Sequence, residues 1–423
     1  MARKKGGKHS QTGTLTRSPL ARGRFPRIPE VQGVRLSSVA AGVRYRGRKD
    51  VMLAELSPGT TVGGVFTRSK TAAAPVVWCR DRLKSGKARA VLVNAGNANA
   101  FTGSEGVSAV ATVAEAVAKQ VGCRATDVFM ASTGVIGEPL PHDRITQALG
   151  RLQRGLSGTS WRAAAEAIRT TDTFAKASSA VAHIDGKPYV IAGIAKGSGM
   201  IAPDMATMLA FLFTDARLPG DVLQKLTVAA NRVSFNAISV DGDTSTSDTV
   251  LTFATGKGPR HARITSASDP RLADFKAKLR SVMTDLAQQI VRDGEGASKF
   301  VTISVSGAES SRAARAIGLA IANSPLVKTA IAGNDPNWGR IVMAVGKAGE
   351  KADRDRLRID IGDWQITAEG MVRADYDESP VARYMKGSEI DIRVDVGVGR
   401  GRFTVWTCDL TRAYVSINAD YRS

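Results

Sequence analysis

The chain has 423 residues, of which 43% are hydrophobic and 23% are charged, so it can bury a large core and is not disordered over most of its length. No segment approaches the roughly 20 consecutive apolar residues of a membrane-spanning helix, which predicts a soluble, cytoplasmic protein with no membrane partner. The net charge of +20 raises the question of nucleic acid, but only 5% of the residues are aromatic and they are not interleaved with the basic ones, so we expect no nucleic-acid partner.

The cysteines and histidines exclude two classes of site. Cys79, Cys123 and Cys408 lie far apart and form no CxxC pair, which argues against a disulfide framework or a zinc site and is typical of a reducing compartment. The four histidines are scattered, and none pairs with another at metal-ligand spacing. We therefore expect no metal and no histidine-based triad, so a general base must come from another group.

The chain begins with a basic arm. Residues 1–29 carry eight Lys and Arg residues and no acidic residue, with Ser, Thr and Gly between them. This composition predicts a disordered extension, which we assign to residues 1–32. The arm lacks the apolar stretch of a secretory signal. A mitochondrial transit peptide is the alternative, but the Lys- and Gly-rich opening would form a poor amphipathic helix.

From about residue 33 strand-like and helix-like segments alternate. Apolar residues at spacings of three and four predict helices over 105–121, 160–169 (with Ser160 as its N-cap), 219–233 and 270–292. Apolar or alternating runs predict strands over 89–94, 128–130, 187–195, 249–254, 357–361, 364–368, 390–396 and 403–407. The apolar run 205–213 fits a strand or a helix. Because the two types interleave from end to end, we expect an α/β or α+β fold.

Two polar segments follow predicted strands. Residues 94–100 are rich in side-chain amides, and a surface turn and a functional loop are equally good interpretations. Residues 132–137 (STGVIG) contain a glycine that would let backbone N–H groups converge, as an oxyanion hole requires. Most turns of this composition only connect elements, so the second segment alone is weak evidence.

Two further polar segments lie in the middle of the chain. Residues 196–209 (KGSGMIAPDMATML) are not a P-loop because the lysine precedes the glycines, and on composition alone Thr207 is a packed side chain of a core element. Residues 239–248 (SVDGDTSTSD) alternate acids and hydroxyls like a calcium loop, but they lack the glutamate that closes an EF-hand. We expect a polar loop near an active site, or a simple turn, in preference to a metal site.

Together these segments resemble the bifunctional glutamate N-acetyltransferase/ornithine acetyltransferase family of arginine biosynthesis. The matching stretches are NAGNANAFTG at 94–103, STGVIG at 132–137, TTDTF at 170–174, KGSGMIAPDMATML at 196–209, DGDTSTSDT at 241–249, DGEGASK at 293–299, NDPNWGR at 334–340 and YVSINADYRS at 414–423. They run in order from about residue 33 to the last residue, and several are long and unusual in composition. The resemblance is therefore specific.

The resemblance implies a layered α/β fold of the aminopeptidase/ornithine acetyltransferase type, with an autoprocessed N-terminal nucleophile. The precursor would cut its own Ala206–Thr207 bond. An alpha chain, 33–206, and a beta chain, 207–423, would then stay together in a heterotetramer of two alpha and two beta chains.

The resemblance also assigns the site residues. Thr207 would be the nucleophile, and Thr133 and Gly134 would form the oxyanion hole. Substrate contacts would fall on Thr170 (with the adjoining Thr171 as the alternative), Lys196, Thr207, Glu295, Asn418 and Ser423. Lys196 would pair with a substrate carboxylate and Glu295 with a cationic amine.

The chemistry of a cut threonine suits these assignments. A threonine hydroxyl needs an adjacent base, and cleavage before Thr207 supplies an α-amino group with a pKa of about 7.7–8.0 within the same residue. The implied reaction moves the acetyl group of N-acetylornithine to glutamate through an acetyl-Thr207 intermediate, without a cofactor. Acetyl-CoA as a further donor stays open, and the alternative is a hydrolase on the same scaffold, an aminopeptidase or amidase.

Overall fold

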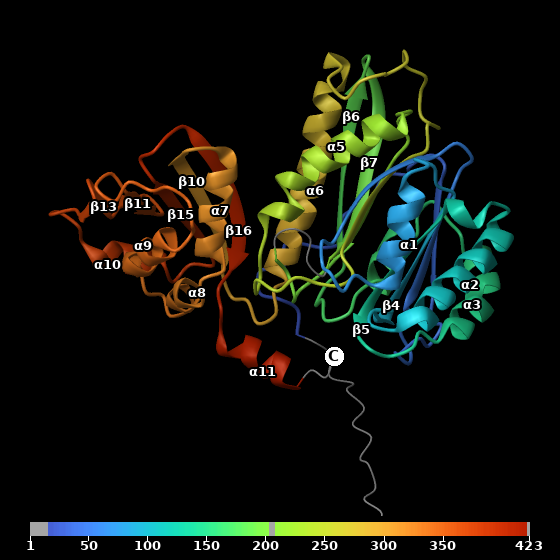
Figure 1. The fold of residues 1–423 in the computed structure, drawn as a ribbon, viewed down its shortest axis with the longest axis horizontal. Helices are drawn as coiled ribbons and strands as arrows, with labels where there is room; N and C mark the ends of the chain where they lie inside the picture. The colour runs from blue at the N-terminus through green and yellow to red at the C-terminus, as the bar shows by residue number, and fades with distance from the viewer. Residues whose placement is uncertain (1–15, 203–207, 421–423) are drawn as a thin grey trace, which may run out of the picture.

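The computed structural model describes residues 16–202 and 208–420. Two β-sheets pack face to face, helices cover the outer face of each, and a third sheet with its own helices forms a separate C-terminal unit (Figure 1). The expected layered α/β fold is confirmed.

The first sheet has four strands in the order β1-β2-β4-β5. These are β1 (Val34–Val39), β2 (Val51–Leu56), β4 (Ala90–Asn97) and β5 (Val128–Val135). β4 and β5 run parallel, so their carboxyl ends lie at the same edge of the sheet. The pairing register shifts at Gly96 and Asn97, which is where the polar segment 94–100 leaves the sheet.

The second sheet has five strands in the order β3-β9-β8-β7-β6. These are β3 (Thr61–Phe66), β9 (Thr249–Ala254), β8 (Leu209–Thr214), β7 (Lys187–Lys196) and β6 (Lys176–Ile184). β7 and β8 are antiparallel, with Lys196 opposite Leu209. The connection from 197 to 208 therefore leaves and re-enters the sheet at one edge.

Alternation along the strands explains the layers. Val91 and Val93 of β4 share one core cluster with Phe211 and Phe213 of β8, between the two sheets. Leu92, which points to the opposite face, packs under α2 (Gly103–Val121) and α3 (His142–Arg154). On the far side of the second sheet lie α5 (Gly220–Arg232) and α6 (Ala273–Arg292). α1 (Ala74–Leu83) and α4 (Trp161–Ala167) complete this part of the molecule.

The C-terminal unit is built on a sheet in the order β12-β11-β15-β10-β16. Its strands are β10 (Phe300–Ala308), β11 (Arg358–Ile361), β12 (Trp364–Gln365), β15 (Glu389–Asp395) and β16 (Gly401–Cys408), beside the small pair β13 (Thr367–Ala368) and β14 (Met371–Val372). Its helices are α7 (Ser311–Ala322), α8 (Pro325–Ala332), α9 (Trp338–Gly346) and α10 (Glu378–Tyr384). The last helix, α11 (Arg412–Asp420), leaves this unit and points toward the main body, below the junction of the two lobes in Figure 1.

The predicted helices are confirmed, with small shifts at their ends. The run 205–213 contributes a strand, β8, which begins at Leu209. Two details of the sequence prediction are wrong. Ser160 precedes α4 but its side chain makes no capping hydrogen bond. The single strand expected over 364–368 is two short strands, of which β12 pairs with β11 and β13 pairs with β14.

The N-terminal arm is only partly as expected. Residues 1–15 lie outside the described residues. From residue 16 onward the chain packs against the body, because Leu20 is buried in the main core and the hydroxyl of Ser18 donates to the carbonyl of Arg292 at 2.5 Å. The prediction of a disordered arm is therefore wrong for residues 16–32. Among residues 16–202 and 208–420, no helix has the length and apolar character needed to cross a membrane.

Candidate active site

The candidate site lies where strands of both sheets end. Thr133 and Gly134 immediately precede Val135, the last residue of β5, and Lys196 is the last residue of β7. Lys196 pairs with Leu209, so the first described residue after the gap, Met208, lies at the same edge. The two sheets thus bring segments 133–134, 196 and 208 together, although 75 positions separate the first from the last.

Lys196 connects two predicted site residues directly. Its side chain is only 2% exposed, and Nζ lies 2.7 Å from Oγ1 of Thr170 and 3.3 Å from Oγ1 of Thr133. Burial lowers the pKa of Lys196, while the carboxylate of Asp172, with Oδ2 3.9 Å from Nζ, opposes that shift. Since an ammonium only donates hydrogen bonds, Oγ1 of Thr133 accepts from it. The hydroxyl hydrogen of Thr133 therefore points elsewhere.

A buried cluster of charged side chains lies next to Lys196. Nζ of Lys176 lies 2.6 Å from Oδ1 of Asp172 and 2.5 Å from Oδ2 of Asp293, and all three side chains are buried. Asp172 also accepts the backbone N–H groups of Thr170 at 3.0 Å and Gly197 at 2.7 Å. Burial alone would raise the pKa of Asp172, but the ammonium groups of Lys176 and Lys196 hold it well below its usual value.

Glu295 and Asn418 form a second contact. Nδ2 of Asn418, on α11, donates to Oε2 of Glu295 at 2.9 Å, and the backbone N–H of Glu295 donates to the carbonyl of Ser198 at 2.9 Å. Burial raises the pKa of Glu295, and the hydrogen bond from Asn418 opposes that shift. A Cβ added at Gly199 would lie 2.5 Å from the Glu295 carboxylate, so any larger residue there would have to displace that carboxylate.

Both threonines of the 170–171 pair reach this region. Oγ1 of Thr170 bonds to Lys196, whereas Oγ1 of Thr171 lies 2.7 Å from Oγ of Ser198. Ser198 also receives the Glu295 backbone N–H, so Thr171 belongs to the Glu295 side of the site. The two threonines therefore face different parts of one site.

The amide-rich segment 94–100 is buried, so its interpretation as a surface turn is wrong. Asn94 accepts a hydrogen bond of 2.6 Å from the hydroxyl of Ser132, and Nδ2 of Asn97 donates to the carbonyl of Glu138 at 3.0 Å. Gly134 has φ +133, and a Cβ there would lie 2.3 Å from the carbonyl carbon of Gly96. The segment is thus a packed wall that fixes the backbone at Thr133 and Gly134.

The 239–249 loop binds backbone N–H groups of residues 200, 201 and 208. Asp241 accepts the N–H groups of Met200 at 2.6 Å and Ile201 at 2.8 Å, and Asp248 accepts that of Met208 at 2.9 Å. These carboxylates bind backbone, in line with the expectation of a polar loop near the site. Within the described part of the chain, no three His, Cys, Asp or Glu side chains are grouped as metal ligands.

Six of the predicted site residues are thus brought together: Thr133, Gly134, Thr170, Lys196, Glu295 and Asn418. Ala206, Thr207 and Ser423 lie outside the described residues. Asp172, Lys176, Asp248 and Ser198 are not among the site residues predicted from the sequence. Asp172, Asp248 and Ser198 lie within stretches that match the family, whereas Lys176 lies outside them and no feature of the neighbouring sequence marks it as a site residue.

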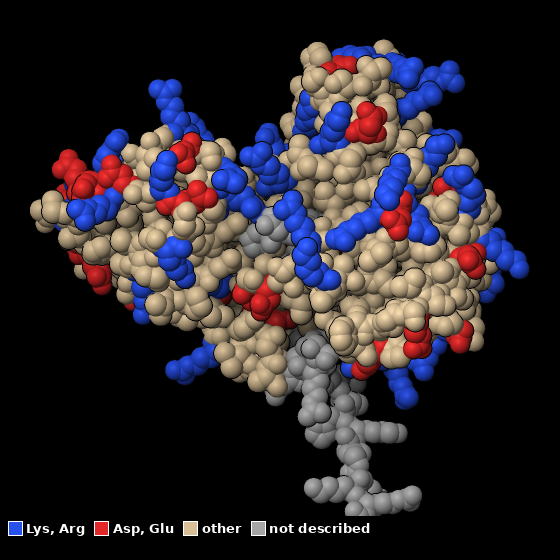
Figure 2. Space-filling view, in the orientation of Figure 1, with Lys and Arg blue, Asp and Glu red and all other residues tan. Residues whose placement is uncertain are grey.

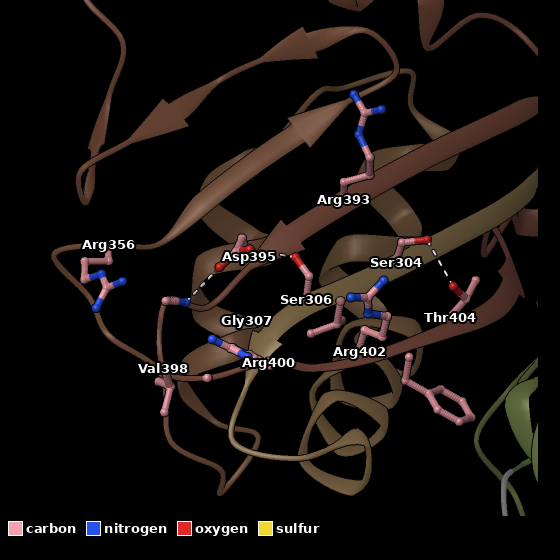
Figure 3. Close-up of a pocket in the computed structure, with 14 residues that line it drawn as sticks. Ser304, Ser306, Gly307, Arg356, Arg393, Asp395, Val398, Arg400, Arg402 and Thr404 are labelled. Atoms are coloured by element: carbon pink, nitrogen blue, oxygen red, sulfur yellow. Dashed lines mark hydrogen bonds between the residues drawn. The ribbon is translucent and has the colours of Figure 1, made fainter.

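A groove of about 830 Å³ lies away from this site. It follows the outer face of β10, β15 and β16, where Arg356, Arg393, Arg400 and Arg402 surround it (Figure 3). Its only acidic residue, Asp395, accepts a hydrogen bond from Ser306. On the face shown in Figure 2, basic side chains are scattered over both lobes, with acidic ones among them. None of the predicted site residues lines this groove.

Comparison with known proteins identifies the family. The ArgJ family model matches residues 35–423. The arginine biosynthesis bifunctional protein ArgJ of Gluconobacter oxydans is 55% identical over 406 residues, 96% of this chain and 95% of that protein. Its namesake from Ruegeria pomeroyi is 57% identical over 408 residues, 96% of this chain and 98% of that protein.

A solved structure of arginine biosynthesis bifunctional protein ArgJ from Bacillus halodurans is also similar. It is 38% identical, covers 50% of this chain and 98% of that chain, and has a TM-score of 0.48. The family assignment rests on the sequence matches, which extend over nearly the whole chain. The resemblance predicted from the sequence is confirmed, and the chain belongs to the ArgJ family.

Proposed function

We propose that this protein is an acetyltransferase of arginine biosynthesis that moves the acetyl group of N-acetylornithine to glutamate, and that it also takes acetyl from acetyl-CoA. Membership of the ArgJ family over residues 35–423 carries the proposal. The name of the related proteins, arginine biosynthesis bifunctional protein, supports two acetyl donors.

Thr207 is the proposed nucleophile. Its hydroxyl first attacks the carbonyl carbon of Ala206, the Ala206–Thr207 C–N bond breaks, and water hydrolyses the resulting ester. The products are a carboxylate on Ala206 and a free α-amino group on Thr207. Near neutral pH part of this amine is unprotonated and can accept the hydroxyl proton of its own residue.

The acetyl transfer then proceeds in two halves. Oγ1 of Thr207 attacks the acetyl carbonyl of N-acetylornithine, the acetyl C–N bond breaks, and the proton removed from Thr207 goes to the departing ornithine amine. The amine of glutamate next attacks the acetyl carbon of the acetyl-Thr207 ester and forms the new C–N bond. The bond between that carbon and Oγ1 of Thr207 breaks, and a proton from the glutamate amine returns to Oγ1. Each half passes through a tetrahedral oxyanion.

Thr133 and Gly134 are the proposed donors to that oxyanion. The ammonium of Lys196 donates to Oγ1 of Thr133, which leaves the hydroxyl hydrogen free for another acceptor. The packing of Gly134 against Gly96 holds the adjoining backbone in place. Such preorganised donors stabilise charge that develops only in the transition state.

The substrate contacts follow from charge. Lys196 is the proposed partner of a substrate carboxylate, with Thr170 beside it, and Glu295 with Asn418 is the proposed partner of the cationic amine of ornithine. Ser423 is a further proposed contact at the chain end. No cofactor is needed, because both half-reactions use only acyl donors and amines.

The assembly is part of the same proposal. Chains 33–206 and 207–423 would remain associated after cleavage and form a heterotetramer, two of each. We place the protein in the cytoplasm, where acetyl-CoA, glutamate and ornithine derivatives are available to a biosynthetic enzyme.

The test combines mass and activity. Intact mass and N-terminal sequencing of the purified protein are expected to give a fragment that begins Thr-Met-Leu. The cut protein is expected to transfer acetyl from N-acetylornithine to glutamate faster than it releases acetate, whereas Thr207→Ala stays uncut and inactive. A fully active uncut chain contradicts the mechanism, and acetate release without transfer supports the hydrolase alternative.

A further inference from the structure

The sheet of the C-terminal unit has one covered face and one open face. Side chains alternate between the two faces of a strand. Ile303 of β10 and Ile392 of β15 are buried in one core cluster with Ile317 of α7, so the helices cover that face. The neighbouring side chains on each strand point to the opposite face, where the groove of about 830 Å³ lies.

The register of the strands places polar side chains in rows on the open face. Ser304 of β10 pairs with Arg393 of β15 on one side and with Thr404 of β16 on the other. The hydroxyl oxygens of Ser304 and Thr404 are 3.2 Å apart. Arg402 precedes Thr404 by two positions on β16, so both point to the same face. The floor of the groove therefore carries hydroxyl groups, with a guanidinium group on either side.

A glycine-rich turn bounds one end of the groove. The connection from β15 to β16 passes over the end of β10, because β10 lies between these two strands. The backbone N–H groups of Val398 and Gly399 donate to the carbonyl of Gly307 at 2.7 and 2.6 Å. A Cβ added at Gly397, where φ is +68, would lie 2.6 Å from Cβ of Arg356. This close approach holds Arg356 at the rim of the groove (Figure 3).

The carboxylate in the groove is engaged by its own strand and turn. Asp395 accepts the hydroxyl of Ser306 at 2.8 Å through Oδ2 and the backbone N–H of Gly397 at 2.9 Å through Oδ1 (Figure 3). Both oxygens thus have partners other than the arginines. The four arginines and one aspartate of the lining give it a net charge of +3.

Three of the four guanidinium groups are not engaged. Arg393 donates to the carbonyl of Gly362 at 2.7 Å. Within residues 16–202 and 208–420, the side chains of Arg356, Arg400 and Arg402 form no ion pair and no hydrogen bond. Like charges around one concavity repel each other, and an anion held between them would turn this repulsion into attraction.

The lining also restricts the kind of anion. A guanidinium fork matches a phosphate group and can bind it through two parallel N–H···O bonds. The aromatic residue of the lining, Phe403, is partly buried against the core cluster of this unit, so little of its ring is available to stack on a base. The volume of the groove is within the range of about 300–1,000 Å³ that is usual for small-molecule sites. These features suit a compact ligand with several negative charges.

We propose that this groove binds a chain of linked phosphate groups, either free or as part of a nucleotide. Arg356, Arg400 and Arg402 are the proposed charged partners of the phosphate oxygens. Only one of the hydroxyls of Ser304 and Thr404 can donate to the other, so the second keeps its hydrogen for a phosphate oxygen. The proposal is independent of acetyl transfer, because no residue of the groove belongs to the candidate active site.

The test titrates the full-length protein with sodium tripolyphosphate at constant ionic strength, by isothermal titration calorimetry. We expect one saturable binding event per chain and a rise in Tm that levels off with the same midpoint. The double variant Arg400→Gln, Arg402→Gln removes two charge-assisted contacts and should weaken Kd at least about tenfold. Both side chains are exposed, so we expect the variant to fold, and circular dichroism checks this.

The matched control is Arg260→Gln, Arg263→Gln, which removes the same charge from exposed side chains of the main body. Its Kd should equal that of the wild type. Absence of saturable binding by the wild type overturns the proposal. Equal weakening in the two double variants also overturns it, because the protein would then attract tripolyphosphate by its net charge alone.

Two further variants test the groove itself. Arg400→Lys, Arg402→Lys keeps the charge but not the fork, so Kd should weaken several-fold, and an unchanged Kd overturns the two-bond recognition of phosphate. Arg356→Gln alters the opposite part of the rim and replaces the glutamine double variant in the comparison if that variant does not fold. An unchanged Kd in Arg356→Gln overturns the assignment of this residue.

Titrations with other phosphates identify the source of the phosphate chain. Equal affinity for ATP and tripolyphosphate supports a site for the chain alone, whereas tighter binding of ATP supports a nucleotide as the ligand. Inorganic phosphate that binds as tightly as tripolyphosphate overturns the requirement for several linked groups.

Discussion

Lys176 and Asp172 form a completely buried ion pair, with Nζ of Lys176 2.6 Å from Oδ1 of Asp172. Lys176 also binds Asp293, and Asp172 also faces Lys196, so two ammonium groups and two carboxylates alternate in one cluster. A buried charge is tolerated when it is paired and hydrogen-bonded. The cluster therefore stabilises the charged form of the buried Lys196 side chain in the candidate site.

Asp172→Asn tests this support. We expect kcat/KM for N-acetylornithine to fall by at least about tenfold, because Asp172 favours the charged form of Lys196 and holds the backbone at Thr170 and Gly197. Lys196 must be charged to bind a carboxylate, so activity is lost as the pH rises through its pKa. Removing Asp172 lowers that pKa, and the basic limb of the kcat/KM–pH profile should move to lower pH.

Asp293→Asn is the matched control for that experiment. It removes the other carboxylate bound to Lys176 but none of the contacts to Thr170, Gly197 and Lys196. Both variants should lose stability to urea, since each leaves the buried cluster one negative charge short. Only D172N should shift the basic limb, and an equal shift in both variants would assign the effect to folding alone.

Thr133→Ala tests the oxyanion donor. We expect kcat to fall about 10²- to 10³-fold with little change in KM, as is typical when one such donor is removed. Thr133→Ser restores the hydroxyl and should recover most of kcat. A T133A variant that keeps wild-type turnover in steady-state assays would contradict the assignment.

Deletion of residues 412–423 tests the contribution of the C-terminal helix. The deletion removes Asn418, which donates to Glu295, and Ser423. Because most of α11 is exposed, the body should stay folded by circular dichroism while KM for N-acetylornithine rises. A tag at the C-terminus should impair activity more than one at the N-terminus, and equal activity of the two tagged proteins would count against this placement.

The three cysteines should differ in reactivity. Burial raises the pKa of Cys79 to about 12 and also raises that of Cys408, and both side chains are buried, whereas Cys123 is half-buried. Iodoacetamide at pH 8 should therefore modify Cys123 first in the native protein, and all three after unfolding. Peptide mass spectrometry measures the order in which the three cysteines are alkylated. Rapid labelling of Cys79 in the native state would contradict the packing described.

The sequence was sufficient for most elements because their patterns are local. The apolar spacing in α2 and the alternation in β15 follow directly from which side of each element is buried. The run before Phe213 was ambiguous because β8 is buried on both faces, which removes the alternation that distinguishes a half-buried strand. Residues 16–32 were misjudged because composition does not reveal that Leu20 reaches the core.

Only the site residues that lie within the family motifs could be predicted from the sequence. Thr133, Lys196 and Glu295 were predicted through the family resemblance, and the structure places them around one region. Lys176 could not be predicted, because its role depends on two aspartates, one of which lies 117 positions away. The distinction between Asp241 and Asp248 likewise required the hydrogen-bond geometry, since both are aspartates of one polar loop.

The strand order of the second sheet has a consequence for the proposed cleavage before Thr207. β3, β7 and β6 come from before position 207, whereas β9 and β8 come from after it, so the two polypeptides that this cleavage would produce share one hydrogen-bonded sheet. Severing the peptide link removes none of these ladders. The halves are thus expected to behave as a single cooperative unit on heating, and to exchange with fresh partner chains only as fast as the whole domain unfolds.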